Sequence, residues 1–290
     1  MRAAMRPYTG DDDLRAMQDL TGRVWSFAAP HHLGDLAWGR FMYPRDAADW
    51  PIVLWESGGR VVAWAWGRLP DDLRLQVDPG FPELVDEALE WLGKLGGDGE
   101  LLVLDRETGL REALSRHGFR ERKDAPYFAY HSRSLEGLPP VFLPEGLRVR
   151  AVADGEQDLR RRVAVHQAAW GSRKVTEESY RAVMAAWPYR HGLDWVVEDD
   201  DGLFLASCLI WHDEVNGVGL IEPVGTHPDH RRLGLSRAVC TAALYALKEH
   251  GAHTAIVCPR GDSAYPVPQR LYRALGFTQY ARTLTYVLSP

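Results

Sequence analysis

The order of strand and helix patterns in the first half of this 290-residue chain recurs in its second half. Residues 52–66 have the pattern of two apolar strands around a Gly-Gly turn, and residues 195–209 have the same plan around one glycine. A helix start in an acidic segment precedes each hairpin, and a Gly-Phe pair follows the last helix of each half. The sequence therefore predicts an α/β (α+β) chain of two similar domains, each with a mixed central sheet flanked by helices.

A short segment rich in proline and glycine separates the two repeats. Residues 136–146 include Pro139-Pro140 and lie outside both repeated patterns. We expect domains at 1–135 and 147–290, each close to the common domain size of about 100–150 residues. Residues 136–146 are then the linker.

The second half contains a loop suited to a phosphate group. An apolar strand pattern over 217–224 leads to Arg231-x-x-Gly234-x-Ser236, and an alanine-rich helix pattern over 237–249 follows. Main-chain N–H groups at a helix N-terminus point toward one spot, where the helix dipole also favours negative charge. Gly234 lets the main chain approach a ligand closely, and Ser236 adds a hydroxyl donor.

This spacing resembles the pyrophosphate loop of the GNAT family of acyl-CoA-dependent N-acyltransferases. The family usually has Gly or Ala at the position of Ser236, so the departure is small. The resemblance implies two tandem GNAT-like domains, of which the second binds acetyl-CoA or CoA. The residues it assigns to cofactor binding are Val224, Gly225, Thr226, Arg231, Arg232, Leu233, Gly234, Leu235 and Ser236.

Residues 269–277 look like the LYxxxGF ending of the same family. Leu271 and Leu275 share one helix face, and the following Gly276 is a typical helix end. By resemblance, Tyr272 is the general acid that protonates the leaving thiolate of CoA. The alternative is a half-buried aromatic side chain that packs on the sheet.

One position departs from the family pattern. Tyr265 stands where GNAT chains often carry an asparagine that contacts the pantetheine arm of CoA. Pro266 and Pro268 also shorten the helix that follows, because proline lacks the N–H that interior helix positions donate. We therefore expect contacts to the pantetheine arm that differ from the usual ones.

Transfer of an acetyl group to an amine also requires the amine to lose a proton. Glu222 lies in an otherwise apolar strand, where a charge is costly unless it has a partner or a function. We predict that Glu222 is the general base; the alternative is an outward-facing position of a half-exposed strand. A main-chain N–H group near 224–226 is expected to stabilise the oxyanion.

The first half lacks the features that carry this chemistry. When the two halves are aligned on the residues that flank the loop, the loop segment of the first half is about five residues shorter. Residues 77–83 also place prolines and carboxylates where N–H donors are needed. Leu114 stands opposite Tyr272 in the repeat. We expect a degenerate first domain that binds no CoA.

Composition argues against several other classes of protein. A formal net charge of −6 is unsuited to a duplex nucleic-acid binder, no apolar run approaches the roughly 18 residues of a membrane span, and the N-terminus has no signal-peptide core. We expect a soluble, cytoplasmic, bacterial protein, either monomer or homodimer, with no metal site. Its cysteines have no C-x-x-C spacing and fit small buried hydrophobes: Cys208, Cys240 and Cys258.

The resemblance implies an acetyl-CoA-dependent N-acetyltransferase that acts on the amine of a small molecule or amino-acid derivative. The acceptor pocket is expected between residues 170 and 195, which are rich in aromatic side chains. Two alternatives remain. One is an acyltransferase of the mycothiol synthase type, with an aminothiol-sugar acceptor, and the other is a non-catalytic acyl-CoA-binding sensor or assembly module.

Overall fold

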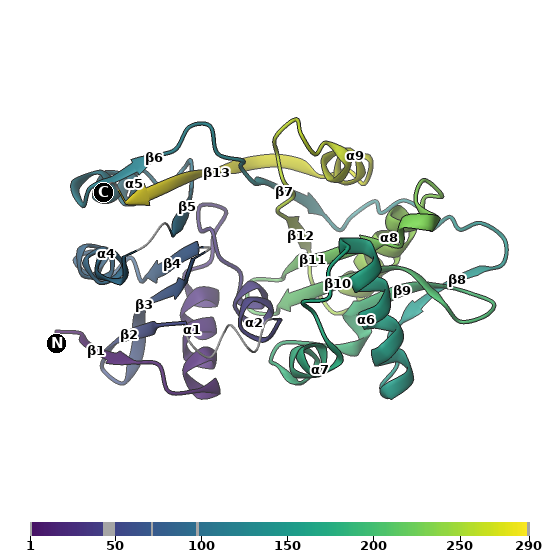
Figure 1. Cartoon of the computed structure of the whole chain (residues 1–290), viewed down its shortest axis with the longest axis horizontal. Coiled ribbons are helices and arrows are strands. Elements are labelled where there is room, and N and C mark those ends of the chain that lie inside the picture. Colours follow the sequence, from purple (N-terminus) through teal and green to yellow (C-terminus); the bar gives the residue numbers. More distant parts are fainter. Residues whose placement is uncertain (1, 43–49, 71, 97–98, 289–290) are drawn as a thin grey trace.

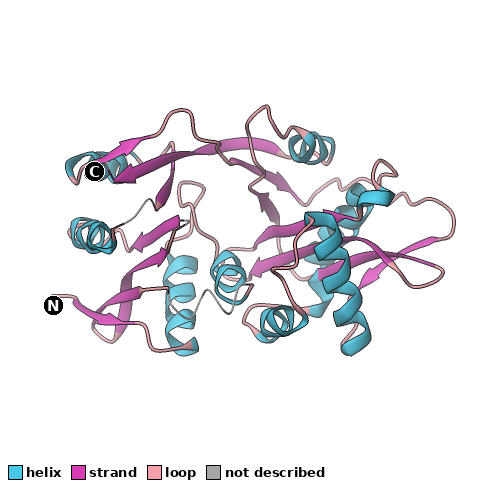
Figure 2. Cartoon of the chain, in the orientation of Figure 1, coloured by secondary structure: helices cyan, strands magenta, loops and turns pink. Residues whose placement is uncertain are grey.

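A computed structural model of the chain describes all residues except 1, 43–49, 71, 97–98 and 289–290. Figure 1 shows the first half on the left and the second half on the right, with both chain ends on the left. Helices lie on both sides of the strands throughout (Figure 2). The predicted α/β class with a mixed sheet is confirmed.

The elements of the first half follow the predicted order of helices, hairpin, and alternating strands and helices. They are β1 (Ala4–Pro7), α1 (Asp11–Arg23), α2 (Leu33–Phe41), β2 (Ile52–Ser57), β3 (Arg60–Arg68), β4 (Asp72–Val77), α4 (Leu84–Leu95), β5 (Glu100–Leu104), α5 (Thr108–Arg116), β6 (Phe119–Glu121) and β7 (Ala129–Ser134).

The second half repeats this order. Its elements are β8 (Leu147–Ala151), α6 (Glu156–Trp170), α7 (Glu177–Ala185), a 3-10 turn η1 (His191–Leu193), β9 (Asp194–Asp199), β10 (Phe204–Asp213), β11 (Val218–Thr226), a 3-10 turn η2 (Pro228–His230), α8 (Leu235–Glu249), β12 (Thr254–Val257), α9 (Val267–Ala274) and β13 (Thr278–Leu288). Both predicted hairpins, β2–β3 and β9–β10, are present.

Helices α4 and α8 each cover one face of the strands in their own half. Buried residues of α8 recur at helical spacing, as the pair Ala238-Val239 and the pair Ala242-Ala243 illustrate. Helices α6 and α7 cover the opposite face of the second half, and α1 and α2 that of the first. Among the helices that the structure describes, none combines the length and apolarity needed to cross a bilayer.

The described strands form one 13-stranded sheet that runs through both halves. The parallel pairs are β4–β5 in the first half and β11–β12 in the second, and the other strand pairs of the described residues are antiparallel. The order across the sheet is β1-β2-β3-β4-β5-β13-β7-β12-β11-β10-β9-β8, with β6 paired to β13.

The closing strands cross between the halves. Strand β7, the last of the first half, pairs with β12 and with the start of β13, so it lies inside the second half. The remainder of β13 continues into the first half, where it pairs with β5 and β6. In Figure 1, β13 is the long yellow strand that spans both halves. Each half of the sequence therefore completes the sheet of the other.

Helix α2 of the first half packs against α7, β10 and β11 of the second. The contact is close at Gly34, where an added Cβ atom would lie 2.1 Å from the Cβ atom of Trp211. A hydrogen bond from Asn216 Nδ2 to the Gly22 carbonyl, 2.7 Å long, adds a second link. The first half is thus fixed against the face of β10 and β11.

The strand exchange leads to a prediction about fragments. Residues 136–290 alone lack β7, which leaves the edges of β12 and β13 without their ladder partner, so we expect no cooperative unfolding transition by circular dichroism. The fragment 123–290 keeps β7 and serves as the matched comparison. We expect it to be the more stable of the two, and we expect residues 1–135 added in trans to stabilise 136–290. Equal melting temperatures for the two fragments would contradict the exchange.

Candidate functional site

The parallel strands β11 and β12 separate in the middle of the second half. They pair only over residues 218–220 and 254–256. Beyond this point β11 continues to Thr226 without β12 as a partner. On the other side of β11, the register with β10 shifts so that Glu222 and Pro223 together face Leu209. Proline has no N–H for a ladder bond, which suits it to such a bulge. The bulge gives Glu222 its place beside the separated strands.

The carboxyl group of Glu222 faces charged groups from the first half of the chain. Burial raises the pKa of Glu222 to about 7, and the negative charge of Asp35 adds to this shift. The cations of Arg74 and Arg68 act in the opposite direction without cancelling it. Glu222 is half-buried, and it changes protonation state near neutral pH.

A half-buried ion-pair cluster of the first half surrounds Asp35 on helix α2. Arg74 of β4 lies 3.2 Å from Asp35, and His31 lies 3.6 Å from the same carboxyl group. Burial acts to raise the pKa of Asp35, but Arg74 and His31 outweigh it, so the pKa lies well below its ordinary value. Asp35 is thus ionised beside Glu222, and it opposes the loss of a proton from that group.

Sequence reasoning missed these first-half residues. In β4, Asp72, Arg74 and Gln76 alternate with the buried Leu73 and Leu75. This period of two predicts a polar face of a strand. Nothing in the pattern says that the polar face meets a strand located about 150 residues further along the chain. The contact depends on the packing of the two halves.

Tyr272 of helix α9 lies in the core beside the separated strands. Its side chain is 5% exposed, and its ring meets Phe277 edge to face at 5.7 Å between centroids. Burial raises the pKa of the phenol well above its ordinary value, and Cys240, Cys208 and Glu222 add to the shift. The phenol is therefore protonated at neutral pH, as a proton donor must be.

The end of α9 has the geometry predicted for it. Gly276 has φ of 83°, its N–H donates to the Arg273 carbonyl, and the Phe277 N–H donates to the Tyr272 carbonyl. These two bonds define a Schellman motif. As expected, the helix is short: it begins only at Val267, directly after Pro266.

Strand β7, which comes from the first half and pairs inside the second, also reaches the point where β11 and β12 separate. Tyr130 of β7 donates a hydrogen bond of 2.8 Å to the Pro30 carbonyl. Cys258 directly follows β12, and burial, with Glu222 and Asp35, raises the pKa of its thiol. The thiol is therefore neutral and unreactive at pH 7.

The predicted phosphate loop connects β11 to helix α8. Gly234 has φ of 81° and Arg232 has φ of 68°, both in the left-handed region. The first helical bond runs from the Ala238 N–H to the Gly234 carbonyl, so the N–H groups of residues 235–237 have no intrahelical acceptor. Thr226 and Ser236 share a hydrogen bond of 2.5 Å between their hydroxyl groups. These features arrange N–H donors and hydroxyls around one helix end.

Helix α6 contacts this loop and the end of β11 before it. Arg231 donates to the Ala169 carbonyl at 3.1 Å, and Gly225 lies so close to helix α6 that an added Cβ would be 2.7 Å from the Ala169 Cβ. Leu233 is 51% exposed, whereas Leu235 is buried in the core, so Leu235 offers a ligand only its main chain. Of the predicted loop residues, Arg232 is also exposed.

The corresponding loop of the first half uses its N–H groups internally. The Asp78 side chain accepts from the Gly80 N–H at 3.0 Å, the Asp78 carbonyl accepts from the Phe81 N–H, and the Phe81 carbonyl accepts from the Leu84 N–H. Leu114, the counterpart of Tyr272 in the repeat, is fully buried in the apolar core. The N–H groups of Gly80, Phe81 and Leu84 are thus already used within the loop, and an apolar side chain stands where the second half has a phenol.

Two tyrosines of the segment expected to line an acceptor pocket direct their hydroxyls into the core instead, whereas Trp170 and Trp187 are exposed. Tyr180 and Tyr189 direct their hydroxyls to Asp194, at 2.5 and 3.2 Å, and Asp194 forms a buried ion pair with Arg162. Trp187 is half-covered by Arg15 of the first half, whose guanidinium lies 3.3 Å from the ring centroid. Aromatic spacing alone does not separate these two uses.

Among the described residues, no group of three or more His, Cys, Asp or Glu side chains is arranged to hold a metal ion. The three thiols are free: Cys208 and Cys240 are buried, and Cys258 is half-buried.

Comparison with known proteins agrees with this geometry. The acetyltransferase (GNAT) family model matches residues 162–277. The chain is 30% identical over 227 residues to a mycothiol acetyltransferase of Kytococcus sedentarius, covering 76% of this chain and 69% of that protein. It is also 30% identical over 161 residues to a mycothiol acetyltransferase of Actinosynnema mirum, covering 54% of this chain and 53%, about half, of that protein's length.

A solved structure has the same fold over the whole chain. It is described as a tandem GNAT protein from the clavulanic acid biosynthesis pathway, and it superposes with a TM-score of 0.66 at 19% identity, covering 100% of this chain and 99% of that one. Together with the sequence relatives, this similarity extends the family resemblance beyond the loop and the LYxxxGF ending. The chain belongs to the GNAT family of acetyltransferases.

Proposed function

We propose that this protein is an acetyl-CoA-dependent N-acetyltransferase that acts on the primary amine of a small molecule or amino-acid derivative. The observation that carries the proposal is the position of Glu222 at the bulge of β11, where β11 and β12 separate ahead of the loop of free N–H donors, with the buried phenol of Tyr272 close enough for the charge of Glu222 to act on it. A base near neutral pKa and a protonated phenol are the two groups that amide formation from a thioester needs.

In this proposal the pyrophosphate of acetyl-CoA binds the loop 231–236, and the pantetheine arm lies between β11 and β12. Val224, Gly225 and Thr226 provide the β11 side of that slot. The thioester carbonyl then receives a hydrogen bond from a main-chain N–H of this segment, which stabilises the oxyanion.

The proton transfers follow from the protonation states of the two side chains. Ionised Glu222 removes a proton from the ammonium group of the acceptor, directly or through water, and the neutral amine attacks the thioester carbon. The nitrogen of the tetrahedral intermediate releases its second proton to solvent, the intermediate expels CoA as a thiolate, and Tyr272 donates its phenolic proton to the sulfur. Glu222 returns its proton to solvent. The products are the amide and CoA, and the phenolate regains a proton from solvent.

The domain roles belong to the same proposal. Residues 147–290 bind acetyl-CoA, while residues 1–135 bind none and instead place Asp35, Arg74 and Arg68 next to Glu222. Fixed charges of both signs at this position favour a polar acceptor over a purely apolar one.

A second candidate is an acyltransferase of the mycothiol synthase type, whose acceptor is an aminothiol sugar. It is supported by the similarity to proteins named mycothiol acetyltransferase and by the polar first-half cluster. The two candidates share one mechanism and differ only in the acceptor. A non-catalytic CoA-binding module is the remaining alternative, and it requires neither Glu222 nor Tyr272.

Two glycines that flank helix α8 provide a matched test of the loop. Gly234 and Gly251 both have positive φ, 81° and 90°, and an added Cβ at either site meets nothing within 4 Å. Alanine at each is therefore expected to cost about 1–2 kcal/mol of stability from backbone strain. Only Gly234→Ala should weaken CoA binding, by at least tenfold in calorimetry, because its Cβ blocks the approach of a phosphate. Equal CoA affinities for the two variants would exclude the loop as the phosphate site.

Turnover of acetyl-CoA with a panel of primary amines, including an aminothiol sugar, tests the activity itself. With the best acceptor, Tyr272→Phe should lower the turnover number about a hundredfold, the low end for general acid–base catalysis. CoA affinity should stay nearly unchanged, since the phenylalanine ring keeps the contact with Phe277. Lost affinity with preserved turnover would assign Tyr272 a packing role. Binding of acetyl-CoA without turnover of any amine would favour the sensor alternative.

A further inference from the structure

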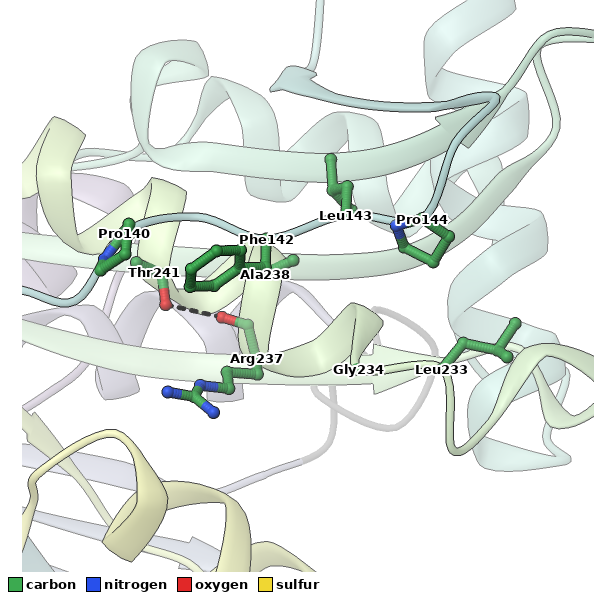
Figure 3. Close-up of a pocket in the computed structure, with 9 residues that line it drawn as sticks. All are labelled: Pro140, Phe142, Leu143, Pro144, Leu233, Gly234, Arg237, Ala238 and Thr241. Atoms are coloured by element: carbon green, nitrogen blue, oxygen red, sulfur yellow. Dashed lines mark hydrogen bonds between the residues drawn. The ribbon is translucent and has the colours of Figure 1, made fainter.

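The two faces of the sheet in the second half carry different features. Beside α8, a pocket of about 310 Å³ lies between this helix and the linker, and Gly234 of the loop already described lines it (Figure 3). On the opposite face, helix α2 of the first half packs against β10 and β11 (Figure 1). Trp211 of β10 belongs to this second contact, in one apolar cluster with Ala37 and Trp38 of α2. Its side chain is fully buried, so neighbours from both halves fix its position.

The indole of Trp211 reaches the bulge that carries Glu222. Trp211 faces Leu220 in the ladder with β11, yet its Nε1–H donates a hydrogen bond of 2.8 Å to the carbonyl of Glu222, two residues further along. Glu222 and Pro223 together face one residue of β10 here, so the regular ladder is interrupted. The indole thus gives a main-chain carbonyl of the bulge a partner that is itself fixed in the core.

The same side chain contacts the first turn of α2. An added Cβ atom at Gly34 would lie 2.1 Å from the Cβ atom of Trp211 and 2.2 Å from its Cγ atom. Carbon atoms that are not bonded to each other cannot come this close, so the approach of α2 requires glycine at this position. Asp35 is the next residue of the helix. One side chain therefore touches both the residue before Asp35 and the main chain of Glu222.

The carboxyl group of Glu222 interacts with charged and titratable groups from both halves. These are Asp35 of α2, Arg68 of β3, Arg74 of β4, Cys258 after β12 and Tyr272 of α9. The interaction of two charges weakens as their distance grows. The influence of the first-half groups on Glu222 therefore depends on where α2 lies relative to β11, and Trp211 is in contact with both elements.

We propose that Trp211 is a positioning residue that acts through Glu222: by binding the Glu222 carbonyl and packing on Gly34, it fixes the separation between the carboxyl groups of Glu222 and Asp35. The use of Glu222 as a base rests on the function proposed above, whereas its coupling to α2 is a property of the fold. A looser contact moves Asp35 away and admits water to Glu222, and both changes favour the ionised carboxylate.

Carboxyl ¹³C NMR of the full chain, labelled on glutamate, follows the titration of Glu222 without any substrate, and Glu222→Gln identifies the resonance. The wild-type midpoint should lie at about pH 7. Trp211→Phe keeps the Cβ and Cγ atoms that contact Gly34 but removes the N–H donor, and it should lower the midpoint by about half a pH unit, less than the effect of a whole charge at close range. Trp195→Phe loses an indole hydrogen bond of the same length, 2.8 Å, to the Gly192 carbonyl, and as the matched control it should leave the midpoint in place.

Gly34→Ala tests the other contact of the indole, because the added Cβ pushes α2 and Asp35 away from Glu222. It should also lower the midpoint, and most of this shift should vanish when Asp35→Asn is already present, as expected for two changes that act through one interaction. Gly22→Ala is the matched control, since its added Cβ at the same junction meets nothing closer than 3.5 Å. Melting temperatures show which variants are folded. If Gly34→Ala does not fold, Trp211→Phe still tests the proposal.

The possible results separate this inference from the function it rests on. If the midpoint stays in place in folded Trp211→Phe, or moves equally in Trp195→Phe, the positioning role is wrong. The proposed function still stands in that case if the wild type acetylates an amine and its kcat/KM falls at the Glu222 midpoint. If the midpoint moves as expected but no amine is acetylated, the coupling through Trp211 is supported and the proposed function fails.

Discussion

The pairing of β13 with strands of both halves is the contact on which the site depends. Its start completes the second half beside β7, and its end completes the first half beside β5 and β6. Because these ladders are continuous main-chain hydrogen bonds, the halves cannot separate without breaking the sheet. The exchange, together with the close contact of helix α2 at Trp211, holds first-half charges within range of Glu222. A site assembled from two halves of a chain requires such a fixed junction.

The first half contributes to the site although its own loop differs from that of the second half. Around Asp78, a side chain and carbonyl groups accept hydrogen bonds from the N–H groups of Gly80, Phe81 and Leu84. Helix α2 and strand β4 of the first half present Asp35 and Arg74 to the second half. Under the proposed function, one repeat provides co-substrate binding and proton transfer, and the other sets the electrostatic environment of the base.

Local sequence signals predicted much of this fold because their causes are local. The glycine turn of each hairpin, the Schellman motif at Gly276 and the proline-shortened helix before it depend on neighbouring residues only. The strand exchange was not predictable, since β7 and the end of β13 have ordinary strand patterns whichever sheet they join. Tyr180 and Tyr189 show the same limit, because their aromatic spacing suited a pocket while their hydroxyls bind Asp194 in the core. The first-half cluster around Glu222 likewise depends on tertiary contacts.

Under the proposed function, charges of the first half set the pKa of the base Glu222, and the pH dependence of kcat/KM tests this most directly. Because the base must be ionised in this proposal and the pKa of Glu222 is about 7, the rate should fall as pH drops through that value. Asp35→Asn removes the negative charge that raises this pKa, so its acid limb should move to lower pH. Asp86→Asn, on the surface of the same half, should leave the limb in place. An acid limb that Asp35→Asn does not move would contradict the account.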